Sequence, residues 1–144
     1  MKGHKKGDKT INKNNYLHLG DLELQIMNII WDKDRPCSVS EIHETLYPEN
    51  KRAYTTIMTI MGNLYKKKVL ERKKEGNAYL YFPVKKREEL AVGLINKITK
   101  GFFKNNIAEF FSCFLKSKDP LSEHEIEELK KKVENYEEEL KDKF

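Results

Sequence analysis

Residues 52–70, RAYTTIMTIMGNLYKKKVL, constrain the fold more than any other segment, because apolar residues recur in them at helical spacing. On a helical wheel, one face collects the side chains of Ala53, Ile57, Ile60, Met61 and Leu64. The opposite face collects Thr55, Met58, Thr59, Gly62 and Lys66, with Thr56 and Asn63 on its flanks. A solvated helix favours long charged side chains, and each β-branched Thr costs it roughly a few tenths of a kcal/mol. The segment therefore predicts one helix with an outer face shaped for contact, unless threonine is merely tolerated there.

Two shorter helices are predicted upstream, at residues 19–33 and 38–47. The first is expected to bury a stripe of four apolar residues, Leu24, Met27, Ile30 and Trp31. The second begins with Ser38 and has Glu41 three residues further on, which predicts a capping box. Pro48 then ends this second helix, because a proline ring cannot continue it.

A β-hairpin is predicted after the third helix. Val69–Lys74 and Ala78–Pro83 form two extended runs around Glu75-Gly76-Asn77, and Gly and Asn both tolerate the positive φ of a tight turn. Three helices followed by a basic hairpin is the plan of a winged helix-turn-helix. In that plan the third helix enters the major groove of DNA and the hairpin, called the wing, reaches the sugar-phosphate backbone.

The last third of the chain predicts helices with too much apolar surface for a small appendage to bury. A connecting helix is expected at residues 87–100 and a phenylalanine-rich helix at 102–115. A final helix is expected to begin with a Ser122–Glu125 capping box. Its apolar residues recur at spacings of 3, 4, 3 and 4, which is typical of a coiled-coil seam. The residues predicted to join two copies are Phe103, Ile107, Phe110, Phe111, Phe114, Ile126, Leu129, Val133, Tyr136 and Leu140. Folding of this segment onto its own wing domain is the alternative.

The predicted fold class is therefore mainly α with a small β-hairpin: a winged helix-turn-helix domain followed by a C-terminal helical dimerisation domain. Residues 1–15 are expected to be a basic disordered tail, residues 16–85 the DNA-binding domain and residues 86–144 the dimerisation domain.

Charge is distributed unevenly along the chain, whose net charge is +5. Residues 51–90 carry eleven Lys and Arg against four Glu, whereas residues 119–144 carry ten acidic residues against five Lys. A basic body with an acidic end fits a polyanionic partner for the first part and a different role for the second. Chance segregation in a lysine-rich chain would look the same.

The residues predicted to contact double-stranded DNA are Tyr54, Thr55, Thr56, Met58, Thr59, Asn63, Lys66, Arg72, Lys73 and Lys74. Hydroxyl groups can bond phosphates or base edges, and a Thr methyl or Met58 can rest on a thymine methyl. The cations, with Lys67 and Lys68, can neutralise phosphates. Tyr54 fits equally well as a half-buried residue at the helix entrance, and Lys66–Lys68 as a solvated helix end.

Three segments, LGDLELQIMNIIWDK, SVSEIHETL and RAYTTIMTIMGNLYKKKVLERKKEGNAYLYFP, together resemble the penicillinase-repressor family of BlaI/MecI type. The resemblance covers about residues 19–141. It implies a cytoplasmic homodimeric repressor that binds a palindromic operator and joins two copies through its C-terminal helices. It also implies relief of repression when a membrane sensor of β-lactams triggers proteolysis in the C-terminal part. By this resemblance Thr55, Thr56, Met58 and Thr59 occupy the recognition positions, and Arg72, Lys73 and Lys74 the wing positions.

Some residues depart from the family pattern. Gly20 stands where many relatives have Ser or Thr at the first helix cap, and Lys68 stands where Gly is common after the third helix. The segment GFFKNNIAEFF does not align cleanly, so no scissile bond can be named. Copper-responsive relatives carry paired CxC ligands near the C-terminus, where this chain has Cys113 alone.

Other functions fit parts of the pattern. A winged-helix repressor that answers a metal or another stress, and a winged-helix protein-interaction module, both remain open. An enzyme is not predicted, because HExxH, GxSxG and phosphate-loop motifs are absent. His4, His18, His43 and His124 are scattered, so no metal or cofactor is expected. No signal peptide or membrane span is expected either, and Cys37 and Cys113 are expected to pack as small apolar side chains in a reducing cytoplasm.

Overall fold

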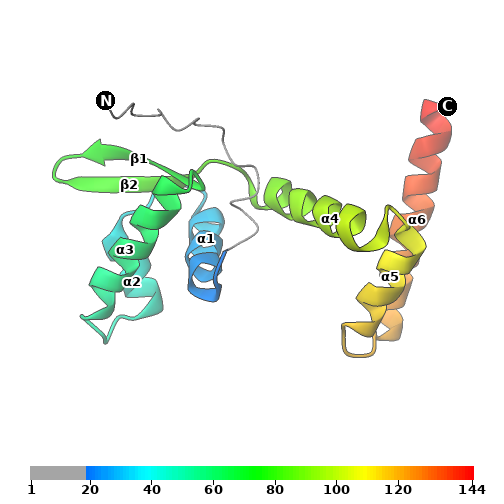
Figure 1. The fold of residues 1–144 in the computed structure, drawn as a ribbon, viewed down its shortest axis with the longest axis horizontal. Helices are drawn as coiled ribbons and strands as arrows, with labels where there is room; N and C mark the ends of the chain where they lie inside the picture. Colours follow the sequence, from blue (N-terminus) through cyan, green and yellow to red (C-terminus); the bar gives the residue numbers. More distant parts are fainter. Residues whose placement is uncertain (1–18) are drawn as a thin grey trace, which may run out of the picture. The chain divides into compact units, whose positions relative to one another are not determined.

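A computed structural model describes residues 19–144 of the chain, so the predicted basic tail lies outside the described residues. The described part contains six helices and one two-stranded antiparallel hairpin (Figure 1). This architecture confirms the predicted fold class of a winged helix-turn-helix followed by a helical C-terminal part, whereas the predicted dimerisation stays a prediction. In order along the chain, the elements are α1 (Asp21–Lys33), α2 (Val39–Leu46), α3 (Ala53–Lys66), β1 (Leu70–Glu75), β2 (Ala78–Pro83), α4 (Arg87–Phe103), α5 (Ile107–Lys116) and α6 (Glu123–Lys143).

The described residues group into two compact units that divide between Asn96 and Lys97, within α4. The start of α4 belongs to the first unit because Leu90 is buried there and Arg87 is held by α1. The Arg87 guanidinium donates to the Asp32 carboxylate at 2.6 Å and lies over the Trp31 ring, 5.4 Å from its centroid. The predicted domain boundary at residues 85/86 stays a prediction.

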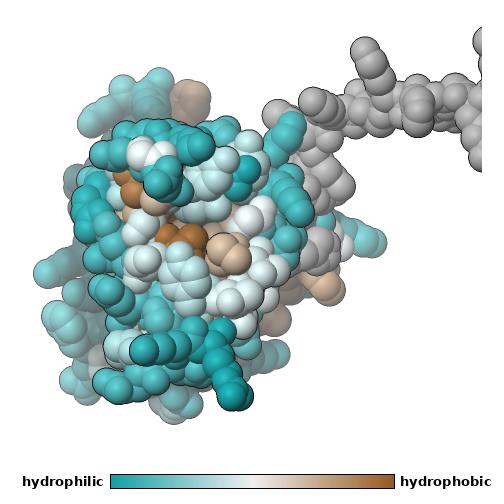
Figure 2. Space-filling model, turned by 90° about the vertical axis from the view of Figure 1, so that its left-hand side faces the viewer, coloured by the Kyte–Doolittle hydropathy of each residue, from teal (hydrophilic) through white to brown (hydrophobic). Residues whose placement is uncertain are grey.

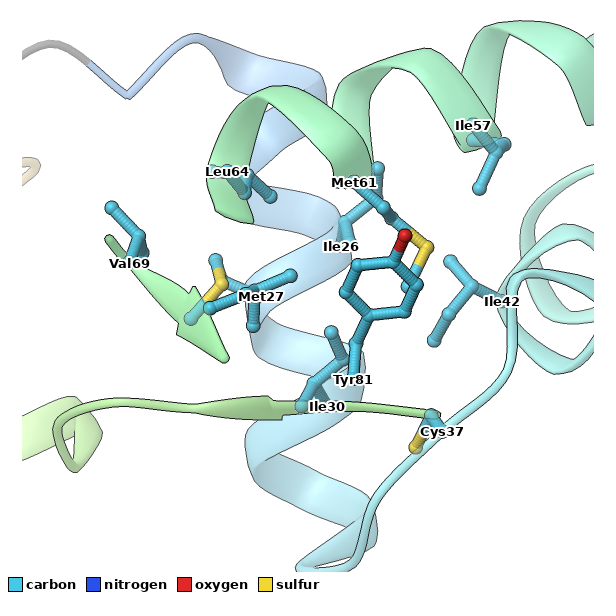
Figure 3. Close-up of a cluster of buried hydrophobic side chains, with 11 residues drawn as sticks. Ile26, Met27, Ile30, Cys37, Ile42, Ile57, Met61, Leu64, Val69 and Tyr81 are labelled. Carbon is cyan, nitrogen blue, oxygen red and sulfur yellow. The ribbon is translucent and has the colours of Figure 1, made fainter. Parts of the chain in front are cut away.

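One apolar core holds α1, α2, α3 and the hairpin together (Figure 3). From α3 it takes Ile57, Met61 and Leu64, which are fully buried as predicted, whereas Ala53 and Ile60 are only partly buried. Burial of each such side chain contributes roughly 1.5–3 kcal/mol. The core comprises Ile26, Met27, Ile30, Cys37, Ile42, Ile57, Met61, Leu64, Val69, Leu70 and Tyr81.

The predicted buried stripe of α1 is partly wrong. Leu24 is 44% exposed and Trp31 is partly buried, whereas Ile26, which the stripe omitted, is fully buried. The buried face is centred near Ile30, and at about 100° per residue Leu24 lies well away from that centre. Periodicity indicated the helix but placed its inner face too far around the wheel.

The helix starts use the predicted caps in different ways. The Ser122–Glu125 box forms completely: the Ser122 hydroxyl accepts from the Glu125 amide at 3.1 Å, and the Glu125 carboxylate accepts from the Ser122 amide at 2.8 Å. At α2 only half of the predicted box forms. Ser38 caps the Glu41 amide, but the Glu41 carboxylate pairs with Arg35 at 2.8 Å.

The wing is a tight hairpin joined to the core. Leu70 pairs with Pro83 and Glu75 with Ala78, which leaves a two-residue turn in which Gly76 has φ 61°. This left-handed conformation favours glycine. A backbone bridge from Cys37 to Tyr81 also links β2 to the segment before α2, with N–O distances of 2.9 and 2.8 Å. The wing is therefore anchored at its base.

The third helix ends earlier than expected, at Lys66 and not at Leu70, because a Schellman turn stops it. The Val69 amide donates to the Leu64 carbonyl and the Lys68 amide to the Tyr65 carbonyl, both at 3.0 Å. Lys68 occupies the left-handed position of this turn with φ 63°, where glycine is the usual residue.

Replacing Lys68 with glycine should therefore stabilise the protein. The left-handed conformation costs a non-glycine residue roughly 1–2 kcal/mol, part of which the greater freedom of glycine in the unfolded chain offsets. We expect K68G to raise the free energy of unfolding by about 0.5–1 kcal/mol. The control K66G, inside the helix, should lower it by a similar amount. Denaturant titration measures both, and a K68G protein less stable than wild type would contradict this account of the turn.

The C-terminal helices also differ from the predicted ranges. α4 continues through Phe103. The left-handed residues Lys104 (φ 48°) and Asn105 (φ 65°) then end the helix and separate it from α5. Asn106 caps α5 by accepting from the Glu109 amide at 3.1 Å. Phe102 and Phe103 therefore belong to α4 and not to the helix predicted at 102–115. Within residues 19–144, no helix is long and apolar enough to cross a bilayer.

Candidate nucleic-acid interface

The outward face of α3 carries the side chains that the sequence placed there. Met58 is 46% exposed, and the other predicted contact residues of this face, Thr55, Thr59 and Lys66, are also exposed, as is Thr56 on its flank. Asn63 is exposed on the flank, as predicted. Gly62 is partly buried, although a Cβ atom added there would have no neighbouring atom within 4 Å. The hydroxyl- and methyl-bearing surface of α3 is thus available to a partner.

A shallow hollow of about 200 Å³ joins α3 to the wing and to the start of α2. Met58 and Tyr54 line it from α3, Tyr79 from β2, and Ser38 and Ser40 from the start of α2. Figure 2 shows this side of the winged-helix unit as a mainly hydrophilic surface with a small hydrophobic patch near its centre. The lining combines hydroxyl groups with apolar side chains, and these two kinds of group can meet base edges and thymine methyl groups in a major groove.

Tyr54 packs at the entrance of α3, which is one of the two roles that the sequence left open. Its ring meets the His43 ring edge-on, with centroids 5.7 Å apart, and His43 Nε2 lies 2.7 Å from the Asn50 carbonyl. These contacts hold the turn between α2 and α3. Tyr54 nevertheless remains 38% exposed beside the hollow.

The basic residues after the recognition helix are not equivalent. Lys73 and Lys74 are exposed on the wing, and Lys66 is exposed at the end of α3. Lys67, which was expected to be able to neutralise a phosphate, instead binds both oxygens of the Glu23 carboxylate at 3.0 and 3.1 Å. This partly buried pair joins the end of α3 to α1, so Lys67 is a structural residue.

Arg72 also has protein partners that a solvated wing cation would lack. Its guanidinium carbon lies 4.0 Å from the ring centroid of Tyr65 and 4.1 Å from that of Tyr79. Arg72 Nη1 donates to the Tyr81 hydroxyl at 3.4 Å, and this bond raises the pKa of the guanidinium above its already high value. Arg72 therefore stays charged while it is stacked between two rings.

Sequence reasoning missed four residues beside the predicted contacts. Lys51 and Arg52 are exposed at the start of α3, and Ser38 and Ser40 line the hollow from the start of α2. Two adjacent cations before a Thr-rich helix could have indicated further phosphate contacts, but Arg52 was interpreted only as the beginning of the helix. The serines became neighbours of α3 only through the packing of α2.

The two cysteines behave differently. Cys37 is buried in the core as expected, and this burial raises the pKa of its thiol. Cys113 is exposed, so its predicted packing is wrong. Among residues 19–144, no cluster of three or more His, Cys, Asp or Glu side chains could hold a metal ion.

The second unit exposes much of the surface predicted for dimerisation. On α5, Ile107 is 65% and Phe111 43% exposed, and on α6 Val133 is 58% and Tyr136 61% exposed. A groove of about 400 Å³ runs between α5 and α6, with six apolar residues along it: Phe111, Leu115, Leu121, Ile126, Leu129 and Val133. Phe103, Phe110 and Phe114 are partly buried, and the Phe103 and Phe110 rings meet edge-on at 5.7 Å.

A three-helix core, an outward-facing third helix and a basic wing define a winged helix-turn-helix DNA-binding protein. Residues 19–135 match the penicillinase repressor family, and the chain belongs to that family. Its members are DNA-binding transcriptional repressors and not enzymes.

Named relatives agree with this assignment. The chain is 31% identical over 121 residues to the methicillin resistance regulatory protein MecI of Staphylococcus aureus, covering 81% of this chain and 94% of that protein. It is 30% identical over 121 residues to a penicillinase repressor of the same species, covering 81% and 91%. It is 39% identical over 77 residues to the transcriptional regulator BlaI of Mycobacterium tuberculosis, covering 54% of this chain and 56% of that regulator.

Proposed function

We propose that this chain is a homodimeric repressor that binds a palindromic operator controlling β-lactam-resistance genes. The observation that carries the proposal is the outward face of α3, where Thr55, Thr56, Met58 and Thr59 lie exposed beside a basic wing. The names of the relatives supply the regulated genes: one regulates methicillin resistance and another represses penicillinase.

The proposed readout divides between two kinds of contact. Thr hydroxyls bond base edges or phosphates, and the apolar ends of Thr and Met58 rest on thymine methyl groups in the major groove. Lys66, Lys73 and Lys74 then neutralise phosphates on either side without reading sequence. Asn63 lies further along α3 and is proposed to meet the backbone.

A gel shift with fragmented genomic DNA tests this function against an interaction module on the same scaffold. At a salt concentration that releases most fragments, the repressor should still bind a small set of them. This set should include DNA upstream of a β-lactamase or penicillin-binding protein gene. Retention of no fragment at any salt concentration would favour the interaction module.

Dimerisation is proposed through the apolar surface of α5 and α6. Two-fold symmetry would place two copies of α3 on the same face of DNA, a multiple of the helical repeat apart, and so require an inverted repeat. The acidic α6, which carries nine Glu and Asp against five Lys, would be repelled by DNA and is proposed to face away from it.

We expect the substitution F111D to convert the dimer into a monomer, because Phe111 is 43% exposed and lines the α5–α6 groove. A buried unpaired carboxylate in each copy opposes association strongly. Sedimentation velocity should give a dimer for wild type and for the control E138A on exposed α6, and a monomer with folded wing domains for F111D. A wild-type protein that stays monomeric at high concentration would contradict the proposal.

Induction is proposed to follow the family pattern: a membrane sensor of β-lactams leads, in the cytoplasm, to cleavage in the C-terminal part. Support comes from the exposed turn at residues 104–106, because backbone outside a helix is more accessible to a protease than backbone within one. Immunoblots of producing cells after β-lactam treatment should show a shortened chain, and an intact chain under full induction would argue for another signal.

A further inference from the structure

We infer that Arg72 is a positioning residue that fixes the wing against the recognition helix, and that it does not itself neutralise a phosphate. The inference rests on the proposed DNA-binding function and changes the role that the sequence assigned to this residue. It gives Arg72 a different role from Lys73 and Lys74, although these two residues follow it directly in the sequence and carry the same charge.

Arg72 and its partners come from three elements. Tyr65 belongs to the last part of α3, Arg72 lies in the middle of β1, and Tyr79 and Tyr81 both belong to β2. The guanidinium carbon lies over both the Tyr65 and Tyr79 rings, 4.0 and 4.1 Å from their centroids, while Nη1 donates to the Tyr81 hydroxyl. One side chain thus links the recognition helix to both strands of the wing.

Tyr81 gives this contact a rigid base. It is 3% exposed, and Figure 3 shows its ring pointing from β2 into the core toward Met61 of α3. Tyr79 lies nearer the turn, where it pairs with Lys74, and is 43% exposed. Arg72 therefore connects a fixed point in the core with the outer half of the wing.

Strand geometry separates Arg72 from its basic neighbour Lys73. Successive side chains of β1 point to opposite faces, so Lys73 leaves the wing on the side away from Arg72. Lys73 and Lys74 are exposed, whereas Arg72 is partly buried. The position of both lysines relative to α3 depends on the angle of the wing, which the Tyr65–Arg72–Tyr79 stack restrains.

Charge-conserving substitutions distinguish positioning from phosphate contact. Lysine serves as a point charge for a phosphate but cannot reproduce a planar stack between two rings. We expect R72K to weaken operator binding roughly tenfold, whereas the matched control K73R stays within about twofold of wild type. Fluorescence anisotropy at fixed salt, well below the melting temperature of each variant, measures both. An R72K protein that binds like wild type would overturn the inference.

A double-mutant cycle tests whether Arg72 acts through the two lysines. In a K73A/K74A background the wing cations are already lost, so adding R72K should change affinity by less than about twofold. A further loss as large as in wild type would mean that Arg72 contacts DNA itself or acts through general stability, and would overturn the inference.

The substitution Y79L gives the same test without touching a charge, and it decides the question if R72K does not fold. It removes one ring of the stack at a half-exposed position, and we expect a similar loss of affinity that is not additive with R72K. In the free protein, ring-current shifts of the Arg72 side-chain protons should be large in wild type and reduced in Y79L. A Y79L protein with wild-type affinity would overturn the inference, whereas a wild-type protein that binds no DNA would overturn the proposed function instead.

Discussion

Raising the salt concentration from 50 to 200 mM should weaken operator binding by about 10³- to 10⁵-fold, the loss expected when six to ten phosphates are neutralised. At least five exposed cations lie at the start or end of α3 or on the wing of each protomer: Lys51, Arg52, Lys66, Lys73 and Lys74. A dimer would bring twice that number to the operator. Lys67 and Arg72 are left out of this set because Glu23 and the tyrosine stack already engage them.

The slope of log affinity against log salt makes this expectation quantitative. Removing one phosphate contact from each half-site, as in K73A, should lower the magnitude of the slope by about 2 for a dimer. The control K141A lies on acidic α6 and should leave the slope unchanged. Anisotropy titrations at four or five salt concentrations give these values, and an affinity independent of salt would exclude the proposed phosphate contacts.

Truncating two methionines on the same helix should change the stability of the protein by very different amounts. Met61 is fully buried, so M61A leaves a cavity in the core and should cost about 2–5 kcal/mol of stability. Met58, three residues earlier, is 46% exposed, so M58A should change stability by no more than about 0.5 kcal/mol. Thermal and denaturant unfolding of both variants measures this contrast.

In operator recognition, M58A should be the substitution with the direct effect, although it changes stability less than M61A. If Met58 rests on a thymine methyl, M58A should lower the ratio of specific to non-specific affinity roughly fourfold in each half-site. This factor corresponds to the loss of about 0.8 kcal/mol per methyl contact. Replacing that thymine with deoxyuridine, which lacks the methyl group, should weaken wild type but not M58A. Equal losses for both proteins would place the methyl contact elsewhere.

Local patterns predicted much of this fold. The apolar period of residues 52–66 identified the buried side of α3, since Ile57, Met61 and Leu64 point one way on any helix of that register. Gly76 located the wing turn, because few other residues adopt the positive φ that it has there. Ser122 and Glu125 located the start of α6 because their reciprocal bonds are purely local.

The failures involve partners that are distant in sequence. Lys67 resembled its neighbours until folding brought it to Glu23, and Arg72 resembled Lys73 until α3 and β2 placed three tyrosines around it. Lys68 adopts the left-handed turn of a glycine because Val69 and Leu70 must enter the core, which no helical pattern encodes. Leu24 and Cys113 are apolar yet exposed, because neighbouring elements do not cover those helix faces.

Selection of bound sequences from random duplex DNA tests the central claim most directly. Wild type should enrich an inverted repeat whose half-sites are centred one or more helical turns apart, about 10–10.5 base pairs each. T56A and M58A should relax preference at particular positions of the half-site, while K73A keeps the same motif with lower recovery. Enrichment of no motif, or of an unchanged motif with T56A and M58A, would contradict readout by the outward face of α3.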